Sequence, residues 1–141
     1  MAPIELAVSP HARLVAGIDS VRINIDNARE NAMLNAIKNC SFTAGHVEDI
    51  TIDRKAKKPD VIIVDPPRAG LSPKGMNVIL TLKPASLIYV SCNPATLARD
   101  LGILTSKGYH IHRIAPFDLF PHTSHLETLA VLGTEPPKNK R

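Results

Sequence analysis

The sequence predicts an α/β protein with a doubly wound, mostly parallel sheet. Segments typical of strands alternate with segments typical of helices, and the connections between them are short, as in βαβ units. Residues 61–64 are four β-branched residues in a row, as expected for a strand buried on both faces of a parallel sheet. The last two expected strands are joined by a loop without a helix, so we expect them to pair antiparallel at one edge.

The first half of the chain predicts two strands and three helical segments. Residues 4–7 are expected to be the last turn of a helix that lacks a capping signal, because a Ser-Pro-His segment then breaks the pattern. Residues 15–19 form a short apolar segment typical of a strand. Between residues 20 and 38 apolar side chains recur every three or four positions, which indicates an amphipathic helix. Residues 40–44 predict the next strand, and a polar turn and a short helix follow it.

The second half continues the same alternation. After the strand at 61–64 we expect a helix at 75–82, strands at 85–90, 109–114 and 126–132, a helix at 96–106, and a tail at 133–141. Leu97, Leu101 and Leu104 fall on one face of the second of these helices, which we expect to point inward. Lys107 and Gly108 are typical of its C-terminal cap.

Composition limits the class of protein. With 141 residues and 44% hydrophobic content, the chain is long enough for one globular domain with a single core. A net charge of +4 permits a polyanionic partner, although the basic runs at 54–58 and 138–141 are also typical of solvated loops and tails.

Cysteine content and apolar runs predict the compartment. Cys40 and Cys92 are too few for a disulfide framework or a metal cluster, and no leader of basic and then apolar residues precedes the first structured residues. The longest apolar runs are far shorter than the roughly 20 residues of a membrane-spanning helix. We therefore expect a cytoplasmic protein with no membrane partner and no metal.

Cys92 is the main candidate for chemistry, in a Ser-Cys-Asn-Pro turn between an expected strand and an expected helix. Helix-terminal N–H groups stabilise a thiolate at such a position, and a buried structural cysteine is the alternative. A cysteine hydrolase would also need a histidine base, which His122 or His125 could supply. A zinc site that uses these two with His110 and His112 has no recognised ligand spacing.

Acidic residues follow two of the expected parallel strands. Asp19 ends the strand at 15–19, where open α/β sheets bind ligands and where an acid commonly binds ribose hydroxyls. A helix N-cap or a solvated turn is the alternative for Asp19. Asp65 begins an Asp-Pro-Pro-Arg-Ala-Gly loop whose prolines stop both helix and ladder, so it is rigid and costs little entropy to order around a ligand. A Pro-rich turn without a ligand is the alternative there.

Three segments occur together in one order and spacing. They are Asp65-Pro66-Pro67-Arg68-Ala69-Gly70, Ser91-Cys92-Asn93-Pro94-Ala95-Thr96 and Phe120-Pro121-His122-Thr123-Ser124-His125-Leu126-Glu127. In this combination the chain resembles the RNA uridine-5-methyltransferase family over residues 4–132. The resemblance implies a Rossmann-like methyltransferase sheet and an enzyme that uses S-adenosylmethionine to make 5-methyluridine in tRNA or rRNA.

The resemblance implies two catalytic residues. Cys92 matches the family's nucleophile, which adds to C6 of uracil and lets C5 attack the methyl group. Glu127 matches the general base that then removes the C5 proton. Without the resemblance, Glu127 would be interpreted as an outward-facing acid of an edge strand.

The resemblance also implies binding residues. Asp19 would hold the ribose hydroxyls of S-adenosylmethionine, His46 would flank the adenine, and Asp65 would lie near the methionine amino end. Family members often carry Glu at the position of Asp19 and Asn at that of His46. Arg68 would contact the flipped base or the RNA backbone.

The chain departs from the family pattern at its start. In the family a first strand and an acidic, Gly-rich loop precede the helix at 4–7, and that strand lies between those that end at Asp19 and Asp65. We expect this chain to lack both, together with the RNA-binding β-barrel and the iron–sulfur cluster of some members. Residues 1–132 would then be a partial catalytic domain that binds S-adenosylmethionine weakly or not at all and is impaired in methyl transfer. The alternative is a non-catalytic RNA-binding or interaction fragment.

Overall fold

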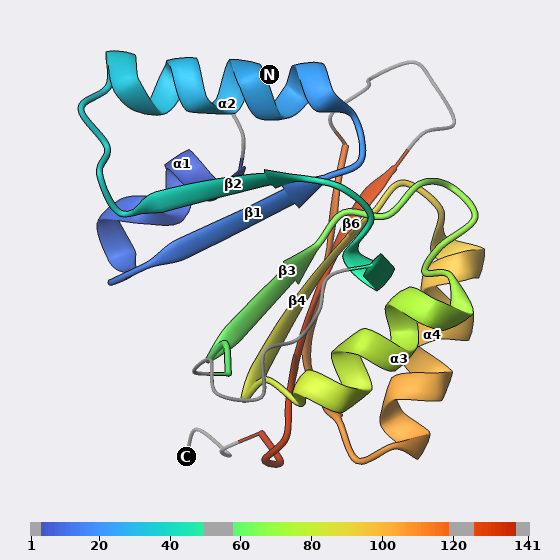
Figure 1. Cartoon of the computed structure of the whole chain (residues 1–141). Coiled ribbons are helices and arrows are strands. Elements are labelled where there is room, and N and C mark those ends of the chain that lie inside the picture. The colour runs from blue at the N-terminus through green and yellow to red at the C-terminus, as the bar shows by residue number, and fades with distance from the viewer. Residues whose placement is uncertain (1–3, 50–57, 119–125, 138–141) are drawn as a thin grey trace. The chain divides into compact units, whose positions relative to one another are not determined.

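The computed structural model describes residues 4–49, 58–118 and 126–137. They belong to two compact units, Met1–Ile52 and Asp53–Arg141, and each has its own sheet with helices packed against it (Figure 1). The buried hydrophobic residues form two clusters, whereas the chain length predicted a single core. There are two clusters because no described strand joins the two sheets by hydrogen bonds. Each sheet therefore packs against the helices of its own unit.

The first unit is a two-stranded parallel sheet with helices. Its elements are α1 (Ile4–Val8), the 3-10 helix η1 (Ser9–His11), β1 (Val15–Asp19), α2 (Arg22–Leu34), β2 (Cys40–Ala44) and the 3-10 helix η2 (Val47–Asp49). β1 and β2 are in register from Val15 opposite Cys40 to Asp19 opposite Ala44. The predicted apolar face of α2 buries Ile25, Ala28 and Ala32 in the same cluster as Phe42 of β2.

Helix α2 is shorter than the predicted range of 20–38. Ala36 adopts a left-handed φ of 54°, and the N–H of Ile37 donates to the carbonyl of Ala32 at 2.8 Å. This is the hydrogen bond of a Schellman-type helix end, here without the usual glycine. The apolar pattern beyond residue 34 therefore belongs to the connection toward β2.

The second unit contains a four-stranded mixed sheet. Its elements are β3 (Val61–Val64), α3 (Pro73–Leu82), β4 (Ser86–Ser91), α4 (Pro94–Ser106), β5 (His110–Phe117) and β6 (Glu127–Gly133). The strand order is β3-β4-β6-β5, in which β3 and β4 are parallel and β6 is antiparallel to both of its neighbours. The predicted antiparallel pair at one edge is confirmed, and β6 also pairs with β4.

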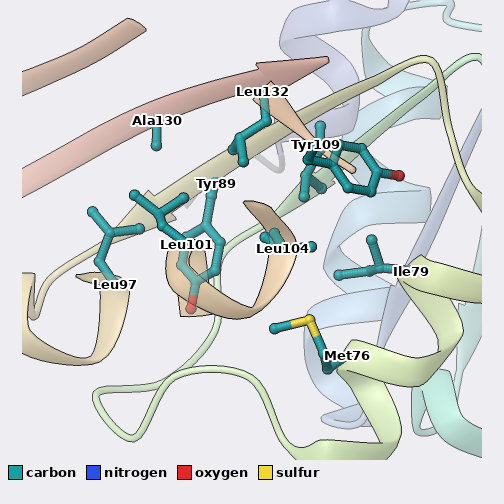
Figure 2. Packing of buried hydrophobic residues seen from close by; sticks show 10 residues of the cluster. Met76, Ile79, Tyr89, Leu97, Leu101, Leu104, Tyr109, Ala130 and Leu132 are labelled. Atoms are coloured by element: carbon teal, nitrogen blue, oxygen red, sulfur yellow. The ribbon is translucent and has the colours of Figure 1, made fainter. Parts of the chain in front are cut away.

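The core of the second unit lies between the sheet and helices α3 and α4, which cover one face (Figure 1). The side chains of Leu97, Leu101 and Leu104 point inward as predicted, and Leu104 is fully buried. Figure 2 shows them packed around Tyr89 of β4 and close to Leu132 of β6. Alternate residues of β4 and β6 face this core, so their other residues lie on the opposite face.

Two expectations for the strands were wrong. β3, an edge strand of its sheet, is not buried on both faces, because 49% of Val61 is exposed and the other three residues are only partly buried. β5 continues through Pro116 to Phe117, where a loop was expected to begin. Proline is tolerated at that position because β5 is the other edge strand and needs no donor on its outer side.

Candidate functional site

Cys92 lies where β4 passes into α4. The hydroxyl of Ser91 donates to the carbonyl of Asn93 at 3.0 Å and accepts from its N–H at 3.1 Å, which closes the turn around Cys92. Asn93 is the N-cap of α4: its side-chain oxygen accepts from the N–H of Ala95 at 3.0 Å, and Pro94 occupies the first helical position. Cys92 therefore directly precedes the N-cap, in a half-buried position held on both sides.

Glu127 reaches the same end of the sheet through β6. Ser91 and Thr128 form the last pair of the antiparallel β4–β6 ladder. Cys92 directly follows Ser91, and Glu127 directly precedes Thr128, so the two residues lie at the same end of adjacent strands. Both residues are half-buried. The pairing of β6 with β4 therefore places Cys92 and Glu127 near the same end of the sheet.

The loop after β3, residues 65–70, is attached to the Cys92 turn. The carbonyl of Arg68 accepts from the side-chain amide of Asn93 and from the hydroxyl of Thr96, each at 3.1 Å. The N–H of Gly70 donates to the carbonyl of Pro67 at 2.8 Å and closes a tight turn. The Asp-Pro-Pro-Arg-Ala-Gly and Ser-Cys-Asn-Pro-Ala-Thr segments, distant in sequence, are therefore hydrogen-bonded neighbours.

Asp65 is the first residue of that loop. Although Asp65 is exposed to solvent, desolvation by the surrounding protein raises the pKa of its carboxyl above the ordinary value of 3.8. A raised pKa means that the folded state disfavours the ionised form. A carboxylate kept at such a cost is typical of functional positions.

The raised pKa predicts the direction in which Asp65→Asn changes the stability of the fold. Because the folded-state pKa exceeds the unfolded-state value, the folded protein loses stability as pH rises from 3.8 through the folded-state pKa. We expect Asp65→Asn to raise the urea midpoint at pH 7 and to lose this advantage below pH 3.8. Urea unfolding of both proteins across this pH range is the measurement, and a lower midpoint for Asp65→Asn at pH 7 would contradict it.

Asp19 and His46 lie at one end of the sheet of the first unit. The carboxylate of Asp19 accepts from the N–H of Val21 at 2.7 Å and from the side-chain amide of Asn24 at 2.8 Å. Asp19 thus closes the turn before α2, which agrees with the alternative of an acid in a turn. The N–H of Gly45 donates to the carbonyl of Asp19 at 3.0 Å, so the turn that carries the exposed His46 is bonded to the end of β1.

An apolar groove of about 300 Å³ runs beside the first turns of α4. It is lined by residues of α4, β5 and β6: Pro94, Leu97, Ala98, Leu101, Ile114, Pro116, Leu126 and Thr128. Two of these residues, Leu126 and Thr128, flank Glu127 in the sequence. The groove offers hydrophobic contact and very few polar groups, and Glu127 itself is not among its lining residues.

Asp100 is not among the residues predicted from the sequence. This residue of α4 is only 1% exposed, accepts hydrogen bonds from Tyr89 and Leu71, and forms an ion pair with Arg99. A signal was present, because an aspartate at this spacing falls on the same helix face as the three buried leucines of α4. A charged residue on an apolar helix face needs partners in the core.

Part of the third sequence motif lies outside the described residues, including His122 and His125. Of the other two histidines considered for zinc, His110 is exposed, and Nε2 of His112 lies 2.7 Å from the carbonyl of Glu135. Over residues 4–49, 58–118 and 126–137, no three His, Cys, Asp or Glu side chains are grouped as metal ligands. None of the helices in this part of the chain is long and apolar enough to cross a bilayer.

The fold is that of the methyltransferase class. M. capricolum TrmK, solved with S-adenosyl-homocysteine, superposes with a TM-score of 0.67 at 12% identity, covering 95% of this chain and 58% of that one. At this low identity the likeness shows a shared fold, which agrees with the mixed sheet and its antiparallel edge pair.

Sequence comparison identifies the family. The model of the tRNA (Uracil-5-)-methyltransferase family matches residues 4–135, and the chain belongs to this family. An uncharacterised RNA methyltransferase of Caldanaerobacter subterraneus is 43% identical over 129 residues, and one of Clostridium acetobutylicum is 44% identical over 124. The Pyrococcus abyssi tRNA (uracil-54, C5)-methyltransferase, solved with S-adenosyl-L-homocysteine, has a TM-score of 0.77 and 38% identity.

These relatives are much longer than the matched region. The alignments cover 92%, 88% and 89% of this chain but 28%, 27% and 30% of the Caldanaerobacter, Clostridium and Pyrococcus proteins, respectively. The chain therefore spans less than a third of the length of each of these relatives.

Proposed function

We propose that this chain carries the reaction centre for methyl transfer to C5 of a uridine in RNA. The observation that supports this most is the β4–β6 register, in which Cys92 directly follows the last paired residue of β4 and Glu127 directly precedes that residue's partner on β6. The reaction needs a thiol nucleophile and a base that act on adjacent carbons of one ring. In a member of this family, two such groups at neighbouring positions suit that chemistry.

Cys92 and Glu127 divide the proposed reaction between them. C5 of uracil is a poor nucleophile, so the Cys92 thiolate first adds to C6, and the C5–C6 π electrons move into an enolate with C5 as its nucleophilic carbon. Once C5 carries the methyl group, the Glu127 carboxylate takes the remaining C5 proton. The released electron pair re-forms the C5–C6 double bond, the S–C6 bond breaks, and the Cys92 thiolate is returned.

S-adenosylmethionine, when bound, supplies the electrophilic methyl group. Asp19 suits the ribose, because each of its carboxylate oxygens accepts one hydrogen bond within the chain and keeps a lone pair for a hydroxyl. We assign His46, exposed in the neighbouring turn, to the adenine. We assign Asp65 to the methionine amino group, since a carboxylate forms a charge-assisted hydrogen bond with an ammonium group.

RNA is the substrate that the proposal implies, either tRNA or rRNA. Arg68 is the residue we assign to the flipped base or the RNA backbone, because its main chain is fixed to the Cys92 turn while the residue is exposed. We further propose that residues 1–132 act as part of one catalytic domain and that the protein acts in the cytoplasm.

Capture of RNA that contains 5-fluorouridine tests the proposed function. Fluorine at C5 cannot be removed as a proton is, so the adduct with the nucleophile persists after methyl transfer. We expect a band that survives denaturing electrophoresis when the chain, this RNA and millimolar S-adenosylmethionine are combined. Peptide mapping is expected to find the RNA on Cys92.

The second cysteine provides the matched control. Cys92→Ala is expected to form no adduct, whereas Cys40→Ala forms as much as the unmodified chain. An adduct mapped to Cys40 would contradict the assignment. RNA binding without any adduct would favour the alternative of a non-catalytic RNA-binding fragment.

A further inference from the structure

Asp100 is the centre of a small polar cluster in the second unit. Its Oδ2 accepts from the hydroxyl of Tyr89 at 2.6 Å and from the N–H of Leu71 at 2.8 Å. Its Oδ1 accepts from Nε of Arg99 at 2.9 Å, and a terminal guanidinium nitrogen of Arg99 lies 2.8 Å away. We call these four residues the Asp100 clamp. Every oxygen of this buried carboxylate therefore has a donor.

The clamp joins three parts of the unit. Tyr89 comes from the centre of β4, and Figure 2 shows its ring pointing away from the sheet among the leucines of α4. Leu71 directly follows the loop at 65–70. Arg99 extends the connection, because its guanidinium also donates to the carbonyl of Ala69 at 2.9 Å. The loop is thus held at its exit by the clamp and at Arg68 by the Cys92 turn.

Gly70 shows how closely the loop approaches the clamp. It has a left-handed φ of 78°, and a Cβ placed on it would lie 2.6 Å from both the guanidinium of Arg99 and Oδ2 of Asp100. The backbone at residue 70 can therefore reach the clamp only without a side chain.

Asp100 places a carboxylate at a buried position of α4 where an apolar side chain could also pack. Desolvation of a buried carboxylate opposes folding, and an apolar side chain of similar volume is often as stabilising. The hydroxyl of Tyr89 shares this environment: burial and then the hydrogen bond to Asp100 raise its pKa well above the ordinary value. What the carboxylate adds over an apolar residue is direction, because its two oxygens fix the positions of one loop N–H and one guanidinium.

We propose that Asp100 is a positioning residue, which fixes the loop at 65–70 relative to the Cys92 turn. It reaches neither substrate nor cofactor in this role. It acts through Leu71 and Arg99 on the main chain that carries Asp65 and Arg68. The inference rests on the proposed function for its effect on the reaction, but its effect on the loop is independent of that function.

Asp100→Asn and Arg99→Gln test the clamp, and Tyr109→Phe is the matched control. Asn at 100 presents an amide donor to the Arg99 guanidinium, and the half-exposed Arg99 can be replaced without opening the core. Tyr109→Phe removes a hydroxyl that donates to the carbonyl of Pro84 at 3.3 Å in the same core, away from the loop. We expect both clamp variants to speed amide exchange at Gly70 and Leu71 about tenfold, and Tyr109→Phe to leave it unchanged.

Adduct formation with 5-fluorouridine RNA supplies the second readout. At saturating S-adenosylmethionine we expect the clamp variants to form the Cys92 adduct at least about tenfold more slowly than Tyr109→Phe, because small misplacements slow reactions strongly. Equal slowing in all three variants would overturn the positioning role, as would unchanged exchange at Gly70 and Leu71 in Asp100→Asn. If the unmodified chain forms no adduct, the proposed function fails, and amide exchange alone then decides whether the clamp holds the loop.

Discussion

We expect Glu127→Gln to accumulate a covalent protein–RNA adduct on ordinary uridine RNA in the presence of S-adenosylmethionine. Glutamine cannot take the C5 proton, so the methylated ring keeps its S–C6 bond and the Cys92 thiolate is not expelled. On the proposed mechanism, proton removal by Glu127 lets the unmodified chain resolve this adduct. The variant is expected to change the trapped fraction from undetectable to a large part of the protein, measured by denaturing electrophoresis with labelled RNA.

A double variant separates this effect from nonspecific crosslinking. Cys92→Ala/Glu127→Gln lacks the nucleophile and is expected to form no adduct. Glu135→Gln, at an exposed position beyond the end of β6, is the matched single control and is expected to behave like the unmodified chain. Free methylated RNA at the normal rate from Glu127→Gln would show that another group is the base.

The largest loss of stability is expected for Leu104→Ala. Leu104 is fully buried in the cluster formed by α3, α4, β4 and β6, so truncation removes buried methyl groups and leaves a cavity. Leucine-to-alanine changes at such positions lower the free energy of unfolding by about 2–5 kcal/mol. Urea unfolding followed by far-UV circular dichroism measures the loss.

Ile103→Ala provides the comparison on the same helix. Ile103 precedes Leu104 but is 39% exposed, so we expect it to lose much less stability than Leu104→Ala. Similar losses for both would mean that helix propensity, not burial, sets the effect. A loss of less than about 1 kcal/mol for Leu104→Ala would contradict the packing of α4 against this core.

The fold was largely predictable because its signals are local. The Ser-Cys-Asn-Pro segment combines an apolar run, an N-cap residue and a proline at the first helical position, and each of these acts within a few residues. The spacing of the leucines in α4 likewise indicates its buried face without knowledge of the partner strands. The extent of α2 was overestimated because its end depends on the left-handed backbone at Ala36, which alanine rarely adopts.

What the sequence could not predict depends on partners distant along the chain. The apolar pattern of the last strand indicates burial, yet nothing in it specifies that β6 pairs with β4 as well as with β5. The placement of Cys92 and Glu127 at the same end of adjacent strands follows from that pairing. The hydrogen bonds of Asn93 and Thr96 to the carbonyl of Arg68 could not be predicted either, nor could that of Asp100 with the N–H of Leu71. The spacing of polar residues along the sequence does not indicate which donor or acceptor they bind.

The position of β6 also has a consequence for biosynthesis. β4 and the Cys92 turn after it are translated well before β6, and the β5 segment that borders β6 in the finished sheet is translated in between. Until β6 enters between β4 and β5, the backbone groups of these two strands that face β6 have no partner within the sheet. The last described strand therefore completes the hydrogen bonding of the sheet, and on the proposed mechanism a polypeptide that stalls before Glu127 has the thiol without the base.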